Sequence, residues 1–239
     1  MKEWSPREIR ALAYEKILTP LWRRRRELAL GVEPSPLELL PMPCERIITL
    51  LVNLKLEEPE EIIPDRGPHP KAGYQIAGVL DRELGRIVSA RKFPLPCRRF
   101  TMLHELGHYF LHPDLLYHRD APLIGSERTE VRGRTREEVE ADTFAAEVLM
   151  PPLLTANLFL AKYGSVISPD EIDEHLAFRL STAAMQTISV DMLVDGSRRD
   201  RSRLIAVEGH GHAGRSFVEL FGASKEAMAI RLEELGLVL

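Results

Sequence analysis

The sequence has few of the features that mark secreted or membrane-embedded proteins. Its 239 residues include only two cysteines, Cys44 and Cys97, which form no CxxC pair, so neither a disulfide framework nor a cysteine-rich zinc knuckle is expected. The sequence contains no run of about 18 apolar residues, and its charged N-terminal segment lacks the apolar core of a signal peptide. These absences predict a cytoplasmic protein without a membrane partner.

An excess of charge of one sign is also missing. The chain carries 32 basic and 36 acidic residues, a formal net charge of -4, which is too balanced to predict a nucleic-acid partner. Two local basic runs, Arg23–Arg26 and Ser197–Arg203, lack the interleaved aromatic residues on which nucleic-acid bases stack. We interpret both runs as solvated surfaces and expect no direct binding of nucleic acid.

Local sequence patterns predict an α+β protein that is mainly helical. Pro6 follows a possible N-cap, Ser5, at the start of a helical segment, and two apolar stretches around Asp81–Gly85 indicate a β-hairpin. A helical period then runs through residues 101–112, with Thr101 as a plausible start. The remaining predictions are helices over 6–30, 44–54, 135–150, 169–180 and 223–235, and a strand pair over 187–194 and 203–209.

The stretch "HELGHYFLH", residues 104–112, contains the motif HExxH. On an α-helix His104 and His108 project from one face and can bind one ion, while Glu105 lies close enough to act as a base on water. The other side of this helix is apolar, so we expect the whole helix to be buried and its histidines to lie in the interior of the protein. Burying two imidazoles and a carboxylate without partners would cost several kcal/mol, and coordination to a cation avoids that cost.

A catalytic zinc site needs a third protein ligand. The metzincin pattern does not apply, because Leu111 and Asp114 stand where it requires Gly and His. His112 continues the helical series, but three ligands along one straight helix would not converge, so we interpret it as a helix-end residue. The helix over 135–150 offers Glu138 and Glu140, which point about 200° apart. At most one of the two can reach the ion, and periodicity does not choose between them.

The segments "RRFTMLHELGHYFLH" and "EADTFAAEVLMP" resemble the ImmA/IrrE family of zinc-dependent metallopeptidases. The resemblance covers roughly residues 44–160, including the predicted hairpin. It implies that His104, His108 and Glu140 are the metal ligands and that Glu105 is the catalytic base. It further implies one zinc ion per chain, with manganese as a possible occupant in cells. Asp142 stands where the family motif more often has Asn, which leaves its role open.

The resemblance also implies an architecture and a function. We expect an N-terminal helical segment over 1–43, a metallopeptidase domain over 44–165 with a small β-sheet packed beside the HExxH helix, and an α-rich C-terminal lobe over 166–239 with a helix-turn-helix-like end. The implied activity is a regulatory endopeptidase that cleaves a helix-turn-helix repressor in a stress or mobile-element response. The alternative is a non-catalytic, antitoxin-like binding protein, against which the presence of Glu105 argues.

Two groups of residues have no assigned role at this point. Tyr109, Tyr117 and His118 are candidates for stabilising the oxyanion of a transition state. His210 and His212, in "EGHGHAG", are candidates for a second metal site, although histidines flanked by glycines are also ordinary loop residues. The stretch over 166–215 looks like an insertion relative to the family.

Overall fold

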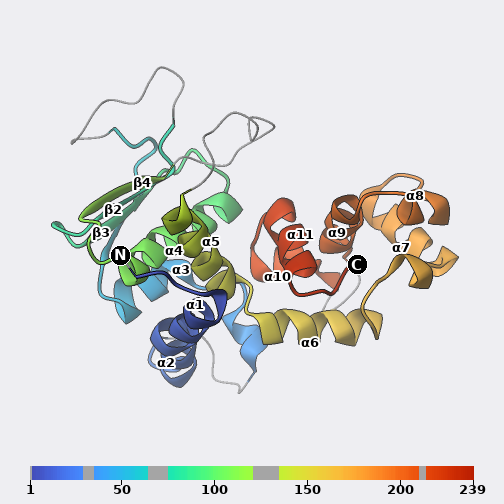
Figure 1. Cartoon of the computed structure of the whole chain (residues 1–239), viewed down its shortest axis with the longest axis horizontal. Helices are drawn as coiled ribbons and strands as arrows, with labels where there is room; N and C mark the ends of the chain where they lie inside the picture. Colours follow the sequence, from blue (N-terminus) through green and yellow to red (C-terminus); the bar gives the residue numbers. More distant parts are fainter. Residues whose placement is uncertain (1, 29–34, 64–74, 121–134, 210–213) are drawn as a thin grey trace. The chain divides into compact units, whose positions relative to one another are not determined.

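The structure of the chain is a computed structural model that describes residues 2–28, 35–63, 75–120, 135–209 and 214–239. It forms two compact units, unit 1 over Met1–Leu149 and unit 2 over Met150–Leu239 (Figure 1). The chain is mainly helical with one small sheet, which confirms the predicted α+β class. The domain limits at residues 43 and 165 stay predictions.

Unit 1 begins with helical turns whose start follows from its N-cap. Ser5 accepts a hydrogen bond from the Glu8 amide (3.3 Å), and the Glu8 carboxylate accepts one from the Ser5 amide (2.9 Å), which satisfies two amides at the helix end. This capping box confirms Ser5 as the N-cap and Pro6 as the first helical residue. The elements that follow along the chain are α1 (Pro6–Ala13), η1 (Tyr14–Leu18), α2 (Thr19–Arg23), η2 (Pro36–Leu39), α3 (Cys44–Arg46) and η3 (Ile47–Leu51).

A four-stranded sheet forms one layer of unit 1, in the order β1-β3-β2-β4. The predicted hairpin is confirmed, because β2 (Gly78–Asp81) pairs antiparallel with β3 (Arg86–Ser89), and Gly85 has the positive φ of 59° that its turn requires. The edge strand β1 (Lys55–Glu57) runs parallel to β3. On the other edge, β4 (Tyr117–Asp120) runs antiparallel to β2.

The long helix α4 (Leu95–Leu111) packs on this sheet, and a second long helix, α5 (Arg136–Leu149), packs on α4. Helix α4 contacts β2 and β3, and α5 lies between α4 and α1. The two helices approach closely at Gly107, where a Cβ would lie 3.0 Å from the Cα of Ala141. Helix α4 starts before Thr101, so the predicted start at that residue is wrong. Its first turn instead begins after Pro94, with Pro96 in the first turn, where an amide needs no partner.

Among the described residues of unit 2, the regular elements are helices, and one isolated parallel bridge joins Ile167 and Val238. Its elements are α6 (Pro152–Tyr163), η5 (Pro169–Glu171), α7 (Glu174–Ala184), α8 (Val190–Val194), α9 (Arg198–Val207), α10 (Phe217–Phe221) and α11 (Lys225–Glu234). The predicted strand pair is wrong, because those segments contain α8 and α9. Two serines explain the difference: Ser189 accepts from the Met192 amide and Ser197 accepts from the Asp200 amide, so each starts a helix.

The basic run Ser197–Arg203 is used within unit 2. Arg199 contacts Glu226 at 2.6 Å and Glu233 at 2.7 Å, and the buried Arg201 donates to the carbonyls of Leu193 and Gly196. These contacts join α9 to α11 and to the end of α8. Among the described residues, no single helix has both the length and the apolar composition for a membrane span.

Candidate metal centre

Helix α4 holds the HExxH residues in the interior of unit 1. His104 is 1% exposed, and Glu105 and His108 are fully buried. This burial confirms that the histidines lie inside, between the sheet and α5. Since one turn of helix separates His104 from His108, both rings leave the same face, and they meet edge to face with centroids 4.7 Å apart.

Two imidazole nitrogens from α4 and one carboxylate from α5 form a small triangle. The Nε2 atoms of His104 and His108 lie 3.0 Å apart, and the Glu138 carboxylate lies 3.4 Å from each, with Oε2 toward His104 and Oε1 toward His108. Ligand atoms about 2.0–2.1 Å from a tetrahedral zinc ion are separated by roughly 3.3 Å. The triangle therefore has the dimensions of three corners of a tetrahedral metal site.

The outer nitrogen of the His104 ring is held by a carboxylate. His104 Nδ1 lies 2.9 Å from Asp142 Oδ1, and since the carboxylate only accepts, the proton is assigned to Nδ1. This assignment leaves Nε2 with a lone pair directed at the triangle. Asp142 follows Glu138 by one turn of α5, so one face of α5 supplies both the carboxylate of the triangle and the group that orients His104.

A second chain of contacts fixes the His108 ring. His108 Nδ1 lies 2.9 Å from His112 Nδ1, and His112 Nε2 lies 2.9 Å from Glu140 Oε2. Because Glu140 accepts the proton of His112 Nε2, His112 Nδ1 is an acceptor and His108 Nδ1 must donate to it. The Nε2 atom of His108 is then also left with a lone pair that faces the triangle.

The residues present fit a metal ion. Two imidazole lone pairs and a carboxylate converge within the triangle, and they repel one another unless a cation lies among them. Burial lowers the pKa of His108 to about 4, which keeps its ring neutral, as a ligand must be. His104, His108, His118 and Glu138 form a group whose potential ligand atoms all lie within 4.8 Å of one another.

His118, on β4, connects the triangle to Glu105. Its Nδ1 lies 3.1 Å from Glu105 Oε2 and its Nε2 lies 2.7 Å from Glu138 Oε1. Burial would lower the pKa of His118, but the two carboxylates outweigh it and raise the pKa to about 9. A protonated His118 thus donates to both carboxylates, and its ring stacks on His108 with centroids 3.7 Å apart.

Glu105 has one oxygen engaged and one that remains able to accept a proton. His118 holds Oε2, while Oε1 is buried and has no hydrogen-bond partner among the described residues. An acceptor of this kind costs roughly 1–3 kcal/mol unless a further group reaches it. The arrangement places an oriented carboxyl group beside a set of metal-binding atoms.

Strand β2 positions this base from the sheet side. A Cβ at Gly78 would collide with the Thr101 methyl and would lie 2.8 Å from Glu105 Oε1, so only glycine lets α4 approach the strand here. Just after β2, Arg82 donates to the carbonyls of His108 (2.9 Å) and His112 (3.1 Å). This cation stabilises the C-terminal end of α4, where carbonyl groups lack helical partners.

The expected role of Glu140 differs from its place in the structure. Its carboxylate contacts His112 and accepts hydrogen bonds from the Trp4 amide (3.0 Å) and from Arg136 Nε (2.8 Å). Burial raises the pKa of Glu140, but these hydrogen bonds outweigh it and lower the pKa. Glu138 occupies the position beside His104 and His108 that the family motif gave to Glu140. The i, i+4 spacing of Glu138 and Asp142 is the sequence signal that points to this register.

The other predicted candidates have the following places. The interpretation of His112 as a helix-end residue is confirmed, since it is the C-cap of α4, and it is also buried. The Tyr109 ring contacts the Arg82 guanidinium, 4.8 Å from its centroid. The Tyr117 side chain, His210 and His212 lie outside the described residues. Cys44 and Cys97 are free thiols, the first of them buried. The contact of Arg82 with α4 had no signal in the sequence.

These groups together suit hydrolysis, because ligand atoms for a Lewis acid lie next to a carboxylate base. Comparison with known protein families gives a match for residues 69–159 to the IrrE N-terminal-like domain, a peptidase family. The matched segment contains the hairpin, α4 and α5, and thus every residue of the candidate metal centre. No curated protein matches the chain at a significant level.

Proposed function

We propose that this chain is a metal-dependent endopeptidase, because residues 69–159 match the IrrE N-terminal-like domain, a peptidase family. The observation that carries the proposal is the buried Glu105 carboxylate, which His118 orients beside the triangle of His104, His108 and Glu138. A purely structural metal site has no use for a buried base. A hydrolase needs one next to the ion.

The residues that would hold the ion are His104, His108 and Glu138, and we propose zinc as the ion. Two imidazoles and one carboxylate form a donor set that zinc hydrolases use, with a fourth position left for water or substrate. When bound, the ion would supply Lewis acidity, which acidifies water and polarises the scissile carbonyl. Manganese stays an alternative, since affinity alone does not set occupancy in cells.

The protein residues would move the proton. Glu105 accepts a proton from the attacking water at Oε1 and later donates it to the nitrogen of the leaving amine. His118 keeps the other oxygen of Glu105 engaged, so that the carboxyl group holds its orientation while Oε1 carries the proton from the first transfer to the second. Burial of the site excludes bulk water, which would otherwise compete for the proton and weaken the electrostatic interactions.

The finer proposal is a regulatory function: cleavage of a helix-turn-helix transcriptional repressor in a stress or mobile-element response. It is supported by the resemblance of "HELGHYFLH" and "EADTFAAEVLMP" to the ImmA/IrrE motifs. The experiment is co-expression of the chain with a candidate repressor, followed by mass spectrometry of repressor fragments. Wild type should release fragments, and Glu105→Gln should release none. Glu137→Gln, on α5 beside the site, is the matched control and should cleave like wild type.

A second candidate function rests on the same cluster. His118 belongs to the group that could hold a metal, and if it were a fourth ligand, the site would be closed and structural. The chain would then be a non-catalytic regulatory protein on a metallopeptidase fold. Metal analysis of His118→Ala separates the two: a closed site loses metal affinity sharply, while the proposed open site keeps its metal and loses only activity.

A further inference from the structure

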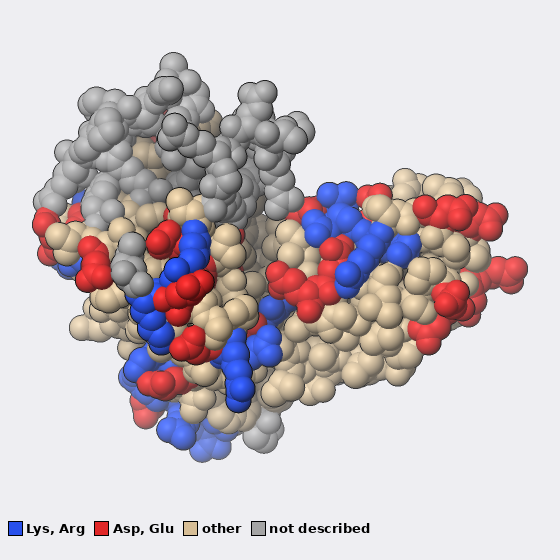
Figure 2. Space-filling model, viewed as in Figure 1, with Lys and Arg blue, Asp and Glu red and all other residues tan. Residues whose placement is uncertain are grey.

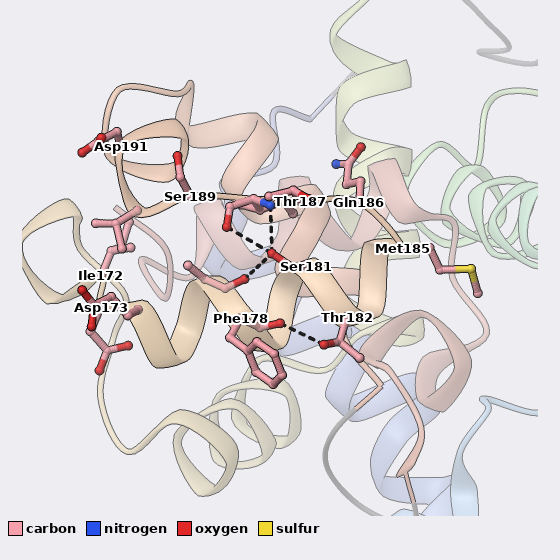
Figure 3. A pocket seen from close by; sticks show the side chains of 14 residues that line it. Ile172, Asp173, Phe178, Ser181, Thr182, Met185, Gln186, Thr187, Ser189 and Asp191 are labelled. Carbon is pink, nitrogen blue, oxygen red and sulfur yellow. Dashed lines mark hydrogen bonds between the residues drawn. The ribbon is translucent and has the colours of Figure 1, made fainter.

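Unit 2 contains an open groove, and none of the residues of the metal centre lines it. It has a volume of about 1140 Å³ and is lined by residues of α7 and of the segment that leads into α8. Ser181 holds the two sides together: its hydroxyl accepts from the Ile188 amide at 2.8 Å and lies 2.8 Å from the Ala177 carbonyl oxygen. Figure 3 shows this serine between the helix and the facing segment. We call this feature the α7–α8 groove.

The α7–α8 groove exposes large apolar side chains. Phe178 is 70% exposed and Met185 is 95% exposed, and both line the groove. Met185 also has a positive φ of 53° at the C-cap of α7, a conformation that glycine adopts without strain and that other residues adopt at a cost. A flexible apolar side chain is thus presented to solvent at a position where glycine would be more favourable. Neither the exposed apolar side chains nor the left-handed backbone at Met185 stabilises unit 2. Their presence therefore indicates a binding function.

The rim of the groove is acidic. Asp173, Glu174 and Asp191 line it, and no lysine or arginine does. The surrounding segment, residues 168–197, contains six carboxylates and a single arginine; that arginine, Arg179, is bound to the buried Glu208. Figure 2 shows acidic side chains gathered at the end of unit 2 that carries α7 and α8. In Figure 3 the carboxylates of Asp173 and Asp191 lie at one end of the groove and Met185 at the other.

We propose that the α7–α8 groove binds a positively charged amphipathic segment of a partner protein. The apolar face of such a segment would cover Phe178 and Met185, as an amphipathic helix does in a hydrophobic groove. Its lysine or arginine residues would face the acidic rim, where charge complementarity favours the correct partner and speeds association. This binding is independent of the peptidase activity proposed for unit 1.

Charge argues against the two other occupants of an exposed apolar groove. A second copy of the chain that docked through the same groove would bring two acidic rims together, which is unfavourable. An anionic membrane surface would repel the rim, because carboxylates are not attracted to negatively charged lipids. Only a partner with a basic face gains from both features of the groove.

The experiment measures binding of a fluorescent peptide to the full-length protein by anisotropy. The probe is a helical peptide of roughly 18 residues, about five turns, with leucine on one face and lysine on the other. Its control is the same peptide with glutamate in place of lysine. We expect the lysine peptide to bind, with an affinity that falls as salt is added, and the glutamate peptide to show no binding.

Matched variants locate the binding. Phe178→Ser should lower the affinity for the lysine peptide at least tenfold, about the effect of losing one hot-spot side chain. Leu153→Ser, which removes an apolar side chain of similar exposure (69%) on α6, should leave it unchanged. Met185→Gly should weaken binding while raising the melting temperature, since it relieves the left-handed conformation. A variant that was only misfolded would bind more weakly but would not have a higher melting temperature.

The charge requirement has its own pair of variants. Glu174→Lys with Asp191→Lys reverses the rim and should abolish binding at low salt. Glu15→Lys with Glu60→Lys makes the same change in net charge on exposed residues of unit 1. This control should bind the lysine peptide at low salt as wild type does. The proposal would be overturned if Phe178→Ser and the rim variant both bound the lysine peptide as wild type does. A dimer that Met185→Gly dissociates, or binding to phosphatidylcholine vesicles that Phe178→Ser abolishes, would overturn it as well.

Discussion

Asp142 accepts a hydrogen bond from His104 Nδ1 at 2.9 Å, and this contact decides which nitrogen of the ring is available for a metal. With the proton held at Nδ1, Nε2 faces His108 and Glu138. Carboxylates that orient ligand histidines in this way typically change metal affinity or activity by about 10–100-fold when removed. Asp142 therefore lies in the same site as the HExxH residues, next to the proposed ligand set and outside it.

The third metal ligand is the first testable point. Glu138→Gln should lower zinc binding strongly, because it removes the carboxylate 3.4 Å from both Nε2 atoms. Glu137→Gln makes the same chemical change one residue away, outside the triangle, and should bind about one zinc ion per chain. The measurement is elemental analysis after dialysis against a fixed free zinc concentration.

Glu140→Gln separates the ligand role from a structural one. It should keep the zinc content near that of wild type but lower the free energy of unfolding by about 1–3 kcal/mol, because it weakens buried contacts with His112, Arg136 and Trp4. Loss of zinc in Glu140→Gln together with retention in Glu138→Gln would show that the register taken from the family motif is right and that ours is wrong.

His118 is the second testable point, as a positioning residue for Glu105. His118→Gln should keep the metal and lower kcat by about 10–100-fold, with little change in KM, because it alters the orientation of the base rather than substrate binding. Steady-state kinetics on a cleavable repressor, with metal content measured on the same samples, provide the check. A variant that loses its metal would instead identify His118 as a ligand.

Gly78 supplies the third point. Gly78→Ala should destabilise unit 1 by about 1–3 kcal/mol, as overpacking does, and should lower activity, because the new Cβ presses on Thr101 and Glu105. The double variant Gly78→Ala with Thr101→Ser removes the methyl group that collides most severely. It should recover part of the stability lost in thermal unfolding. If the single variant unfolds and cleaves like wild type, the close approach of β2 to α4 has no role in placing the base.

Some local signals in the sequence predicted the structure directly. Ser5 and the hairpin turn at Gly85 each act on the residues beside them, and both predictions are confirmed. The strand pair failed because apolar, β-branched runs fit strands and helices alike, while Ser189 and Ser197 start helices there. The spacing of Glu138 and Asp142 shows that these two residues share a face of α5, but which face meets His104 and His108 depends on the packing of α5 against α4 at Gly107 and Ala141.

The last prediction concerns a buried ion cluster in unit 2. Glu208 is fully buried, and its carboxylate contacts Lys162 at 2.8 Å and Arg179 at 2.8 Å. Burial raises the pKa of Glu208, but the hydrogen bonds from Lys162 and Tyr163 outweigh it, and the net effect lowers the pKa. A carboxylate whose pKa is lower in the folded state binds fewer protons there than in the unfolded state. Its contribution to stability is therefore complete above the unfolded pKa of about 4.3 and is lost as the pH falls below it.

Glu208→Gln should consequently lower the stability of unit 2 at pH 7 by about 3–5 kcal/mol, because it leaves two partly buried cations, Lys162 and Arg179, without their anion. Wild type should lose protection of the α9 amides in hydrogen exchange when the pH falls from 7 to about 3, a range that spans the unfolded pKa. In Glu208→Gln, which already lacks the ion pair, the protection of the α9 amides should change less over that pH range, after correction for the intrinsic exchange rate. Glu234→Gln, at a side chain 52% exposed, is the matched control and should cost no more than about 1 kcal/mol. Equal acid sensitivity of wild type and Glu208→Gln would mean that this cluster does not hold unit 2 together.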